Sequence, residues 1–229
     1  MQKNILIIGS SSQIGREVIK LSSAKGDNVF ATSRSPIDIP VKKFIQLDPN
    51  EDLSDLDSLP ESIDALVYCP GSISLKSIQR MDISDIREDF RINFEGAFHI
   101  IKKVLPNLKR DDGASVVFVS SVAANTGMTF HSSISASKAA LEGFARSLSA
   151  ELAPRVAVNC IAPSLTDTPM AEHLINSESK LKSSKERHPL SVIGDPENIA
   201  RVIYNLFSAK ENWITGQTIN IDGGLSTLR

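Results

Sequence analysis

The stretch ILIIGSSSQIGR, at residues 5–16, decides the fold of this chain. It begins with four apolar residues, as a short buried strand does, and continues into a turn that contains two glycines. Ile14, Val18 and Leu21 then recur at the spacing of one helix face. Glycines in such a strand-to-helix turn let backbone N–H groups approach a pyrophosphate, and the positive end of the helix dipole favours the same anion. The stretch therefore predicts a nucleotide-binding turn.

Short apolar runs alternate with helical patterns along the rest of the chain. Their apolar content is nearly continuous, which is typical of strands that are buried on both faces of a parallel sheet. We expect strands at residues 4–8, 28–33, 43–47, 64–69, 115–120, 155–161 and 217–221. The alternation predicts an α/β fold with a doubly wound, Rossmann-like parallel sheet in three layers (αβα), formed by residues 1–229 as a single domain.

Two stripes of residues at helical spacing indicate helices that face the core or an interface. One stripe is Phe90, Asn93, Phe94, Ala97, Ile101 and Val104, and the other is Ile199, Val202, Ile203 and Leu206. The second stripe has a clear start, because Asp195 can cap the helix, Pro196 suits its first position and Glu197 complements the dipole.

The stretch 164–190 differs from its surroundings, because Ser, Lys and Glu accumulate there around a few apolar residues. It shows no sustained strand pattern. We expect it to be a mobile flap over the site, with a solvated loop that has no function as the alternative.

Composition narrows the function classes. The 25 Lys and Arg residues face 27 Asp and Glu residues, so there is no overall positive field for nucleic acid or an anionic membrane. The apolar run at 5–8 is too short for a signal sequence or a membrane span, so we expect a cytoplasmic protein. Cys69 and Cys160 lie inside apolar runs and are expected to be buried free thiols. Because no His, Cys or carboxylate cluster has ligand spacing, we expect no metal site.

The end of the second strand indicates which nucleotide is bound. An acidic residue at this point would bind both ribose hydroxyls of NAD and repel a 2′-phosphate. Ser33 cannot do so, and Arg34 offers a bidentate fork to that phosphate. The pair predicts NADP(H) in preference to NAD(H), with a merely solvent-facing Arg34 as the alternative.

Further motifs are spread along the chain. They are Arg91-Ile-Asn93-Phe-Glu-Gly96, Val119-Ser-Ser121, Ser135-Ala-Ser-Lys138-Ala-Ala, Val158-Asn-Cys-Ile-Ala-Pro163, Ile214-Thr-Gly-Gln217 and Ile221-Asp-Gly-Gly224. With the glycine turn, they resemble the short-chain dehydrogenase/reductase family over nearly the whole chain. The resemblance implies an oxidoreductase that acts on a small carbonyl or alcohol and assembles as a homodimer or homotetramer.

The resemblance also implies which residues contact the cofactor. They are Gly9, Ser11, Gln13, Ile14, Gly15, Ser33, Arg34, Asp48, Gly71, Asn93, Lys138, Pro163, Thr166 and Thr168. The chain departs from the family pattern where Gln13 replaces a glycine, Pro70 replaces the alanine of Asn-Ala-Gly, and Ser164 replaces the glycine after Pro163. For Asp48, a plain Asp-Pro turn is the alternative to an adenine contact.

In this family, carbonyl reduction uses a serine, a tyrosine, a lysine four residues later, and an asparagine. Ser121, Lys138 and Asn93 match three of these positions, and Ile134 stands at the tyrosine position. The tyrosine supplies the proton that the carbonyl oxygen needs, and loss of a general acid costs on the order of 10²- to 10⁴-fold in rate. For Asn93, a purely structural tie between a helix and a neighbouring strand is the alternative.

Neighbouring side chains offer few replacements for the tyrosine. Ser133 and Ser135 flank the position but point about 100° away from it on a helix. Ser137 lies on the correct face, but its hydroxyl is short and nearly non-acidic. His131 is a candidate acid because imidazole titrates near neutrality, with a surface or capping histidine as the alternative.

Two functions therefore stay open. The first is an NADP(H)-dependent oxidoreductase with impaired or altered proton transfer, in which Ser121 polarises the oxygen and Lys138 holds the ribose. The second is a catalytically silent NAD(P)(H) sensor, or an oligomerisation partner of an active homologue that pairs through helices at 82–105 and 133–153. A stripe of small residues suits close helix packing, either between subunits or within one chain. It consists of Ala136, Ala140, Gly143 and Ser147.

Overall fold

The computed structural model describes residues 2–108, 113–209 and 213–228, and these residues form a seven-stranded parallel sheet. The strands are β1 (Asn4–Ile8), β2 (Asn28–Ser33), β3 (Lys43–Gln46), β4 (Ala65–Tyr68), β5 (Ala114–Val119), β6 (Val156–Pro163) and β7 (Thr218–Ile221). Their order in the sheet is β3-β2-β1-β4-β5-β6-β7. The order reverses between β1 and β4, the point at which open α/β sheets bind ligands.

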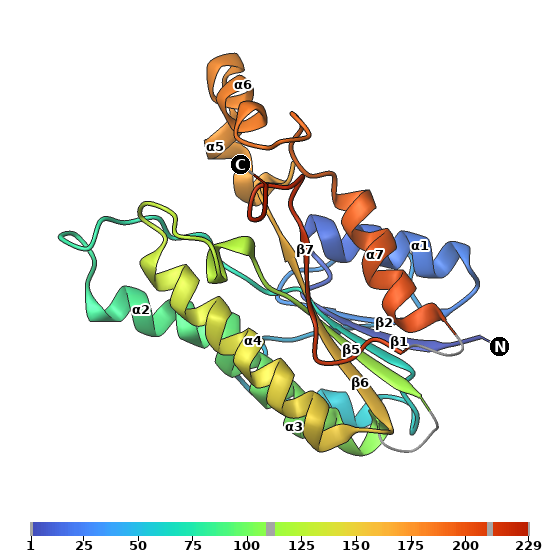
Figure 1. Cartoon of the computed structure of the whole chain (residues 1–229). Helices are drawn as coiled ribbons and strands as arrows, with labels where there is room; N and C mark the ends of the chain where they lie inside the picture. Colours follow the sequence, from blue (N-terminus) through green and yellow to red (C-terminus); the bar gives the residue numbers. More distant parts are fainter. Residues whose placement is uncertain (1, 109–112, 210–212, 229) are drawn as a thin grey trace.

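Helices cover both faces of the sheet, which confirms the three-layer prediction (Figure 1). Helices α1 (Gln13–Ala24) and α7 (Pro196–Ser208) lie on one face. Helices α2 (Ile83–Phe90), α3 (Gly96–Leu108) and α4 (Ser132–Leu152) lie on the other. Short 3₁₀ turns occur at Ser54–Ser58, Val122–Ala124 and Pro169–Ala171.

The strand pattern explains this arrangement. Each predicted strand is present, with ends within two residues of those expected. Alternate residues of β1 point to opposite faces, so Leu6 and Ile8 join the core under α3 and α4. Ile5 and Ile7 join the core under α1 and α7. All four side chains are fully buried, which is why the run reads as continuously apolar.

The helix starts follow their capping residues. Asp195 caps α7 by accepting a hydrogen bond from the backbone N–H of Glu197 at 3.0 Å, with Pro196 at the first position as predicted. Ser12 caps α1 by accepting from the N–H of Gly15 at 3.1 Å. This second cap fixes the point at which the glycine turn becomes a helix.

The stripe around residue 93 is not one regular helix. Between α2 and α3, Arg91–Glu95 form a single π-helical turn. Asp89 and Asn93 are thereby buried, whereas Phe90 and Phe94 are only partly buried. Apolar spacing alone does not show such a turn, and π turns of this kind are common near functional sites.

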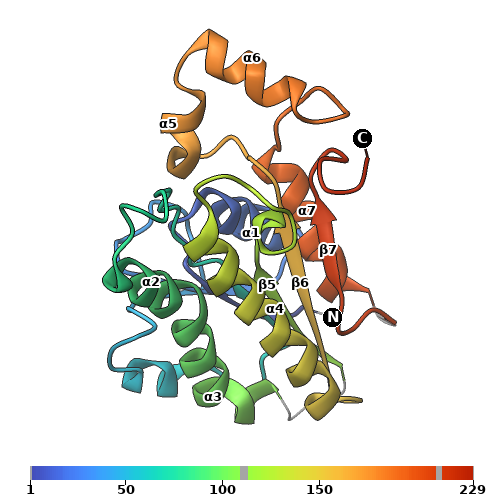
Figure 2. The same cartoon turned by 60° about the vertical axis from the view of Figure 1, so that its left-hand side comes forward.

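The stretch 164–190, expected to be a flap, is largely helical. It contains α5 (Glu172–Ile175) and α6 (Glu178–Glu186), which project beyond the carboxyl ends of the strands (Figure 2). Ser177 caps α6 through the N–H of Lys180 at 3.3 Å. The sequence did not indicate these helices, because only Ser184 of α6 is buried and no apolar stripe is required.

Candidate functional site

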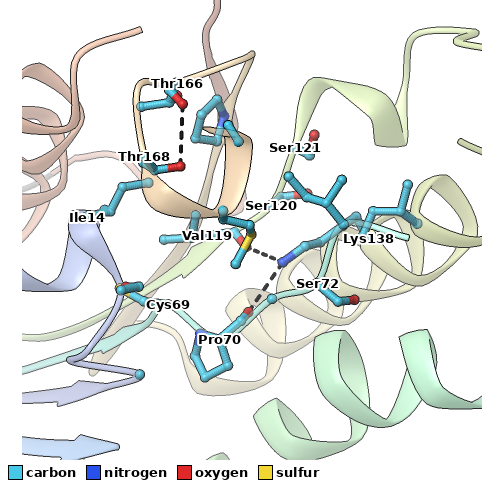
Figure 3. Close-up of a pocket in the computed structure, with 18 of the residues that line it drawn as sticks. Ile14, Cys69, Pro70, Ser72, Val119, Ser120, Ser121, Lys138, Thr166 and Thr168 are labelled. Atoms are coloured by element: carbon cyan, nitrogen blue, oxygen red, sulfur yellow. Dashed lines mark hydrogen bonds between the residues drawn. The ribbon is translucent and has the colours of Figure 1, made fainter. Parts of the chain in front are cut away.

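A cavity of about 570 Å³ lies at the carboxyl ends of the strands, between the sheet and the flap. Its wall includes most of the predicted site residues: Gly9, Ser11, Gln13, Ile14, Ser33, Arg34, Asp48, Gly71, Ser121, Ile134, Lys138, Pro163, Thr166 and Thr168. Figure 3 shows several residues of this wall, with Ile14 and Cys69 on one side and Ser121 and Lys138 on the other. Gly15 and Asn93 lie behind the wall rather than on it.

The turn after β1 requires its two glycines for different reasons. Gly9 has a φ of +75°, and a Cβ atom there would lie 2.8 Å from Cδ of Pro70. A Cβ atom on Gly15 would lie 2.9 Å from the carbonyl oxygen of Gly9. Neither position accepts a side chain without a backbone shift. The turn therefore keeps its backbone open to the cavity at the N-terminus of α1, as an anion-binding turn must.

The last residue of β2 and the residues that follow β2 and β3 also line the cavity. Ser33 is buried, and its hydroxyl donates to the carbonyl of Ser35 at 2.6 Å. Arg34 is exposed and lines the cavity. Asp48 accepts a hydrogen bond from the N–H of Asn50 at 2.9 Å. The Asp-Pro turn that was the alternative to an adenine contact is therefore present. Asp48 also lines the cavity.

Lys138 reaches the cavity from α4 and is almost fully buried. Its Nζ donates to the carbonyl of Val119 at 2.7 Å and approaches that of Pro70 at 3.5 Å (Figure 3). Burial lowers the pKa of Lys138 to about 8. A Cβ atom on Gly71 would lie 3.3 Å from the ammonium, so the chain passes close to it.

Asn93 connects the π turn to the segment after β4. Its Nδ2 donates to the Ser72 hydroxyl at 3.0 Å and to the carbonyl of Asp89 at 2.8 Å. Its Oδ1 accepts from the N–H of Ser72 at 3.3 Å. The side chain is fully buried behind Gly71, so the structural tie considered for this residue is present, although it holds a loop rather than a strand.

Ser121 lies at the end of β5, where its hydroxyl oxygen accepts from the N–H of Ala123 at 3.2 Å and caps the 3₁₀ turn. A buried carboxylate, Glu142, holds this region: it accepts from Ser120 Oγ at 2.7 Å and from Asn125 Nδ2 at 2.6 Å. Sequence reasoning missed Glu142. Its position four residues after Lys138, on the same helix face, was the available signal.

Ile134 is buried in α4 and lines the cavity. The Ser137 hydroxyl, which lies on the same helix face as Ile134, donates to the carbonyl of Ile134 at 3.2 Å. This bond uses the proton that Ser137 could otherwise offer to a substrate. His131, also on the cavity wall, immediately precedes α4, and its Nδ1 lies 2.7 Å from the carbonyl oxygen of Thr129.

Ser164 and His188, near the two ends of the flap, contact each other at the cavity wall, a contact that sequence reasoning did not predict. Ser164 Oγ lies 2.5 Å from Nε2 of His188, and both residues line the cavity. The two positions are 24 residues apart, so their contact depends on the path of α5 and α6. A histidine in a stretch of Ser, Lys and Glu was the only signal in the sequence.

Cys69 and Cys160 are free and buried, as expected. Burial raises the pKa of each thiol to about 12. Among residues 2–108, 113–209 and 213–228, no group of three or more His, Cys, Asp or Glu side chains is arranged to hold a metal ion. No helix in the described parts of the chain has the length and apolar character needed to cross a membrane.

A family model and individual relatives of known name match the same kind of protein. The model of the family described as enoyl-(acyl carrier protein) reductase matches residues 53–226. The chain is 32% identical to 3-oxoacyl-(acyl-carrier-protein) reductase FabG of Thermotoga maritima, with 97% of each protein covered. It is 30% identical to the FabG of Aquifex aeolicus, with 96% of each covered.

Solved structures agree with these relatives. Ligand-free aldohexose dehydrogenase of Thermoplasma acidophilum superposes with a TM-score of 0.92 at 27% identity, covering 100% of this chain and 95% of that one. The NADP complex of RhlG from Pseudomonas aeruginosa superposes with a TM-score of 0.89 at 25% identity, covering 98% and 96%.

Proposed function

Because the chain belongs to the short-chain dehydrogenase/reductase family of NAD(P)-dependent oxidoreductases, we propose that it transfers hydride between NADP(H) and a small carbonyl or alcohol. The observation that carries the proposal is the cavity that joins the glycine turn to Ser121 and Lys138. The FabG relatives are named as 3-oxoacyl reductases, which favours the direction of carbonyl reduction.

The chain's own residues fit a dinucleotide. Gly9 and Gly15 keep side chains out of the turn, so a diphosphate can approach the N-terminus of α1. Arg34, exposed at the cavity, offers two parallel donors to a 2′-phosphate, and Ser33 presents no competing carboxylate. This pair supports NADP(H) in preference to NAD(H). Thr166 and Thr168 line the end of the cavity near the flap and would contact the nicotinamide portion.

The reaction depends on how charge on the substrate oxygen is handled. The bound nicotinamide supplies or accepts the hydride. Ser121 donates a hydrogen bond to the carbonyl oxygen, and Lys138 holds the nicotinamide ribose. Ile134 occupies the position of the family's tyrosine and has no proton to give, so proton transfer is impaired or follows another route. His131 stays a candidate donor, and unchanged turnover after its removal would exclude it.

Ile134 also favours a second candidate function, a catalytically silent nicotinamide sensor or an oligomerisation partner of an active homologue. The small-residue stripe of α4 supports the partner role, because it is exposed or only partly buried within the chain. A Cβ atom on Gly143 would contact only the end of Arg146, at 3.8 Å. The stripe is therefore open to a second subunit, which also supports a homodimer or homotetramer.

Nicotinamide absorbance with a panel of 3-oxoacyl thioesters, aldehydes and ketones separates the two functions. We would compare the natural protein with Ile134→Tyr and Ile134→Phe. The phenylalanine variant is the matched control, since it adds the ring without the hydroxyl. Turnover by the natural protein supports the reductase. If the natural protein and Ile134→Phe show no turnover but Ile134→Tyr does, the natural protein is a catalytically silent nucleotide-binding protein on an intact scaffold.

A further inference from the structure

A buried histidine faces the cavity from the flap side and has no role in the reaction described so far. His188 is only 2% exposed. Its Nε2 lies 2.5 Å from Ser164 Oγ, and its Nδ1 lies 2.7 Å from the carbonyl oxygen of Ser184. Burying an imidazole costs free energy unless its ring nitrogens form hydrogen bonds, and here both nitrogens do.

The two contacts define how the pair carries a proton. The carbonyl of Ser184 can only accept, so Nδ1 of His188 must carry a hydrogen. In neutral His188, Nε2 therefore accepts from the Ser164 hydroxyl. When His188 is protonated, Nε2 donates to Ser164 Oγ instead, and the serine hydrogen is released to point into the cavity.

The serine oxygen has a second donor. The N–H of Leu165 lies 2.6 Å from Ser164 Oγ and donates to it. This bond favours negative charge on the oxygen, which eases the loss of its proton to an acceptor in the cavity. Ser164 is thus placed as a donor, with His188 behind it.

Two charged residues lie near His188, one in the loop after β7 and one next to it in the chain. Asp222, in the loop after β7, is one: burial raises its pKa, but hydrogen bonds from Ser226 and Gly224 and the nearby His188 lower it overall. Arg187 is the other, and its guanidinium donates to Ser184 Oγ at 3.3 Å. A Cβ atom on Gly223 would lie 3.4 Å from that of His188, so this loop packs closely on the ring.

We infer that Ser164 and His188 form a proton relay that replaces the tyrosine missing at Ile134, an inference that rests on the proposed reductase function. As the carbonyl carbon accepts hydride from the reduced nicotinamide dinucleotide, the C=O π bond opens and its oxygen takes the proton of Ser164 Oγ. Nε2–H of His188 then returns a proton to Ser164, which leaves neutral His188 with hydrogen on Nδ1. Solvent reprotonates His188, and the net change is one hydride and one proton added to the carbonyl. Ser164 is the catalytic residue, and His188 acts through it.

Single, double and rescue variants test the relay in turnover assays. Ser164→Ala and His188→Gln should each lower kcat for carbonyl reduction by 10²- to 10⁴-fold, and the double variant should lose no more than either single variant. Glutamine retains hydrogen-bonding groups but cannot carry the proton. Ser183→Ala and His173→Gln, exposed on the same flap, are the matched controls. Adding Ile134→Tyr to Ser164→Ala should restore turnover, which a merely structural serine would not allow.

Two further readouts test the relay separately. In the cofactor-free protein, ¹⁵N NMR of the His188 ring should show the Nδ1–H tautomer when the ring is neutral, and Ser164→Ala should shift the Nε2 resonance. In the natural protein, the rate of carbonyl reduction should fall as pH rises, and His188→Gln should remove that part of the profile.

The outcomes separate this relay from the proposed function. If NADPH binds and turnover occurs but Ser164→Ala and His188→Gln leave kcat unchanged, the relay is wrong and the reductase stands. Loss of turnover in His131→Ala alone would place the donor there and overturn the relay. If NADPH binds but only Ile134→Tyr turns over, the relay is also wrong. If NADPH does not bind, the proposed function itself fails.

Discussion

At the residue scale, Lys138 is a buried ammonium that also lines the cavity. Because burial lowers the pKa of its ammonium in the folded protein to about 8, the folded chain releases this proton before the unfolded chain does. Between about pH 8 and the ordinary lysine value near 10.4, the unfolded state binds more protons, so folding becomes more favourable as pH rises. Below pH 8 both states are protonated and the contribution is flat.

We therefore predict that the unfolding free energy of the cofactor-free protein gains roughly 3 kcal/mol at most from Lys138 across this range. Urea titrations at several pH values would measure it. Lys138→Met should remove the gain, whereas Lys102→Met, on the exposed side of α3, should leave it. Equal slopes in the natural protein and Lys138→Met would show that the buried ammonium is not the cause.

The sequence indicates some of these residues and not others, for a physical reason. Ser121 and Lys138 follow from motifs with fixed local spacing. The contact of Ser164 with His188 depends on the path of 24 intervening residues, which no local spacing encodes. Glu142 likewise gains its role from Ser120 and Asn125, which lie on another element.

At the element scale, the turn between β1 and α1 carries the proposed nucleotide site, and the two structural constraints on Gly9 can be separated by mutation. Gly9→Ala combines the strain of a positive φ with a 2.8 Å approach to Pro70. Gly26→Ala has a φ of +85° but meets open space, so it carries the strain alone. We predict that Gly26→Ala loses about 1–2 kcal/mol of stability and keeps its NADPH affinity. Gly9→Ala should lose more stability and at least tenfold in affinity.

Thermal unfolding and NADPH titration of both variants would measure these effects. Equal losses of stability, with affinity kept in Gly9→Ala, would mean that the close approach at Pro70 does not shape the site.

The elements also show where sequence patterns are sufficient. The ends of the central strands β1, β2, β4, β5 and β6 were predicted to within two residues because these strands are buried almost throughout and their apolar runs are continuous. The edge strands β3 and β7 are only partly buried, and their ends also lie within two residues of those predicted. The π turn at Arg91–Glu95 was not predicted, because its extra residue changes hydrogen bonding and not composition. Helix α6 was missed because it is mostly exposed, so local capping and not an apolar stripe defines it. The mobility of the flap stays a prediction.

At the scale of the whole molecule, the small-residue stripe of α4 is the proposed contact between subunits. On the proposed homodimer or homotetramer, Ala140 packs against a neighbouring subunit, so a long charged side chain there would separate the subunits. We predict that Ala140→Arg lowers the mass measured by analytical ultracentrifugation. Ala24→Arg, exposed at the end of α1, is the control and should not. An unchanged mass for Ala140→Arg would exclude this face as the contact.

The central claim for the whole molecule is the proposed binding of NADP(H) across the carboxyl ends of its strands. Isothermal titration calorimetry with NADPH and NADH tests this most directly. We predict saturable binding of both nucleotides, with NADPH tighter, and an Arg34→Ala variant that loses about tenfold in affinity for NADPH and little for NADH. No heat with either nucleotide at millimolar concentration would contradict the proposed site at the glycine turn, and with it the roles of Ser121 and Lys138.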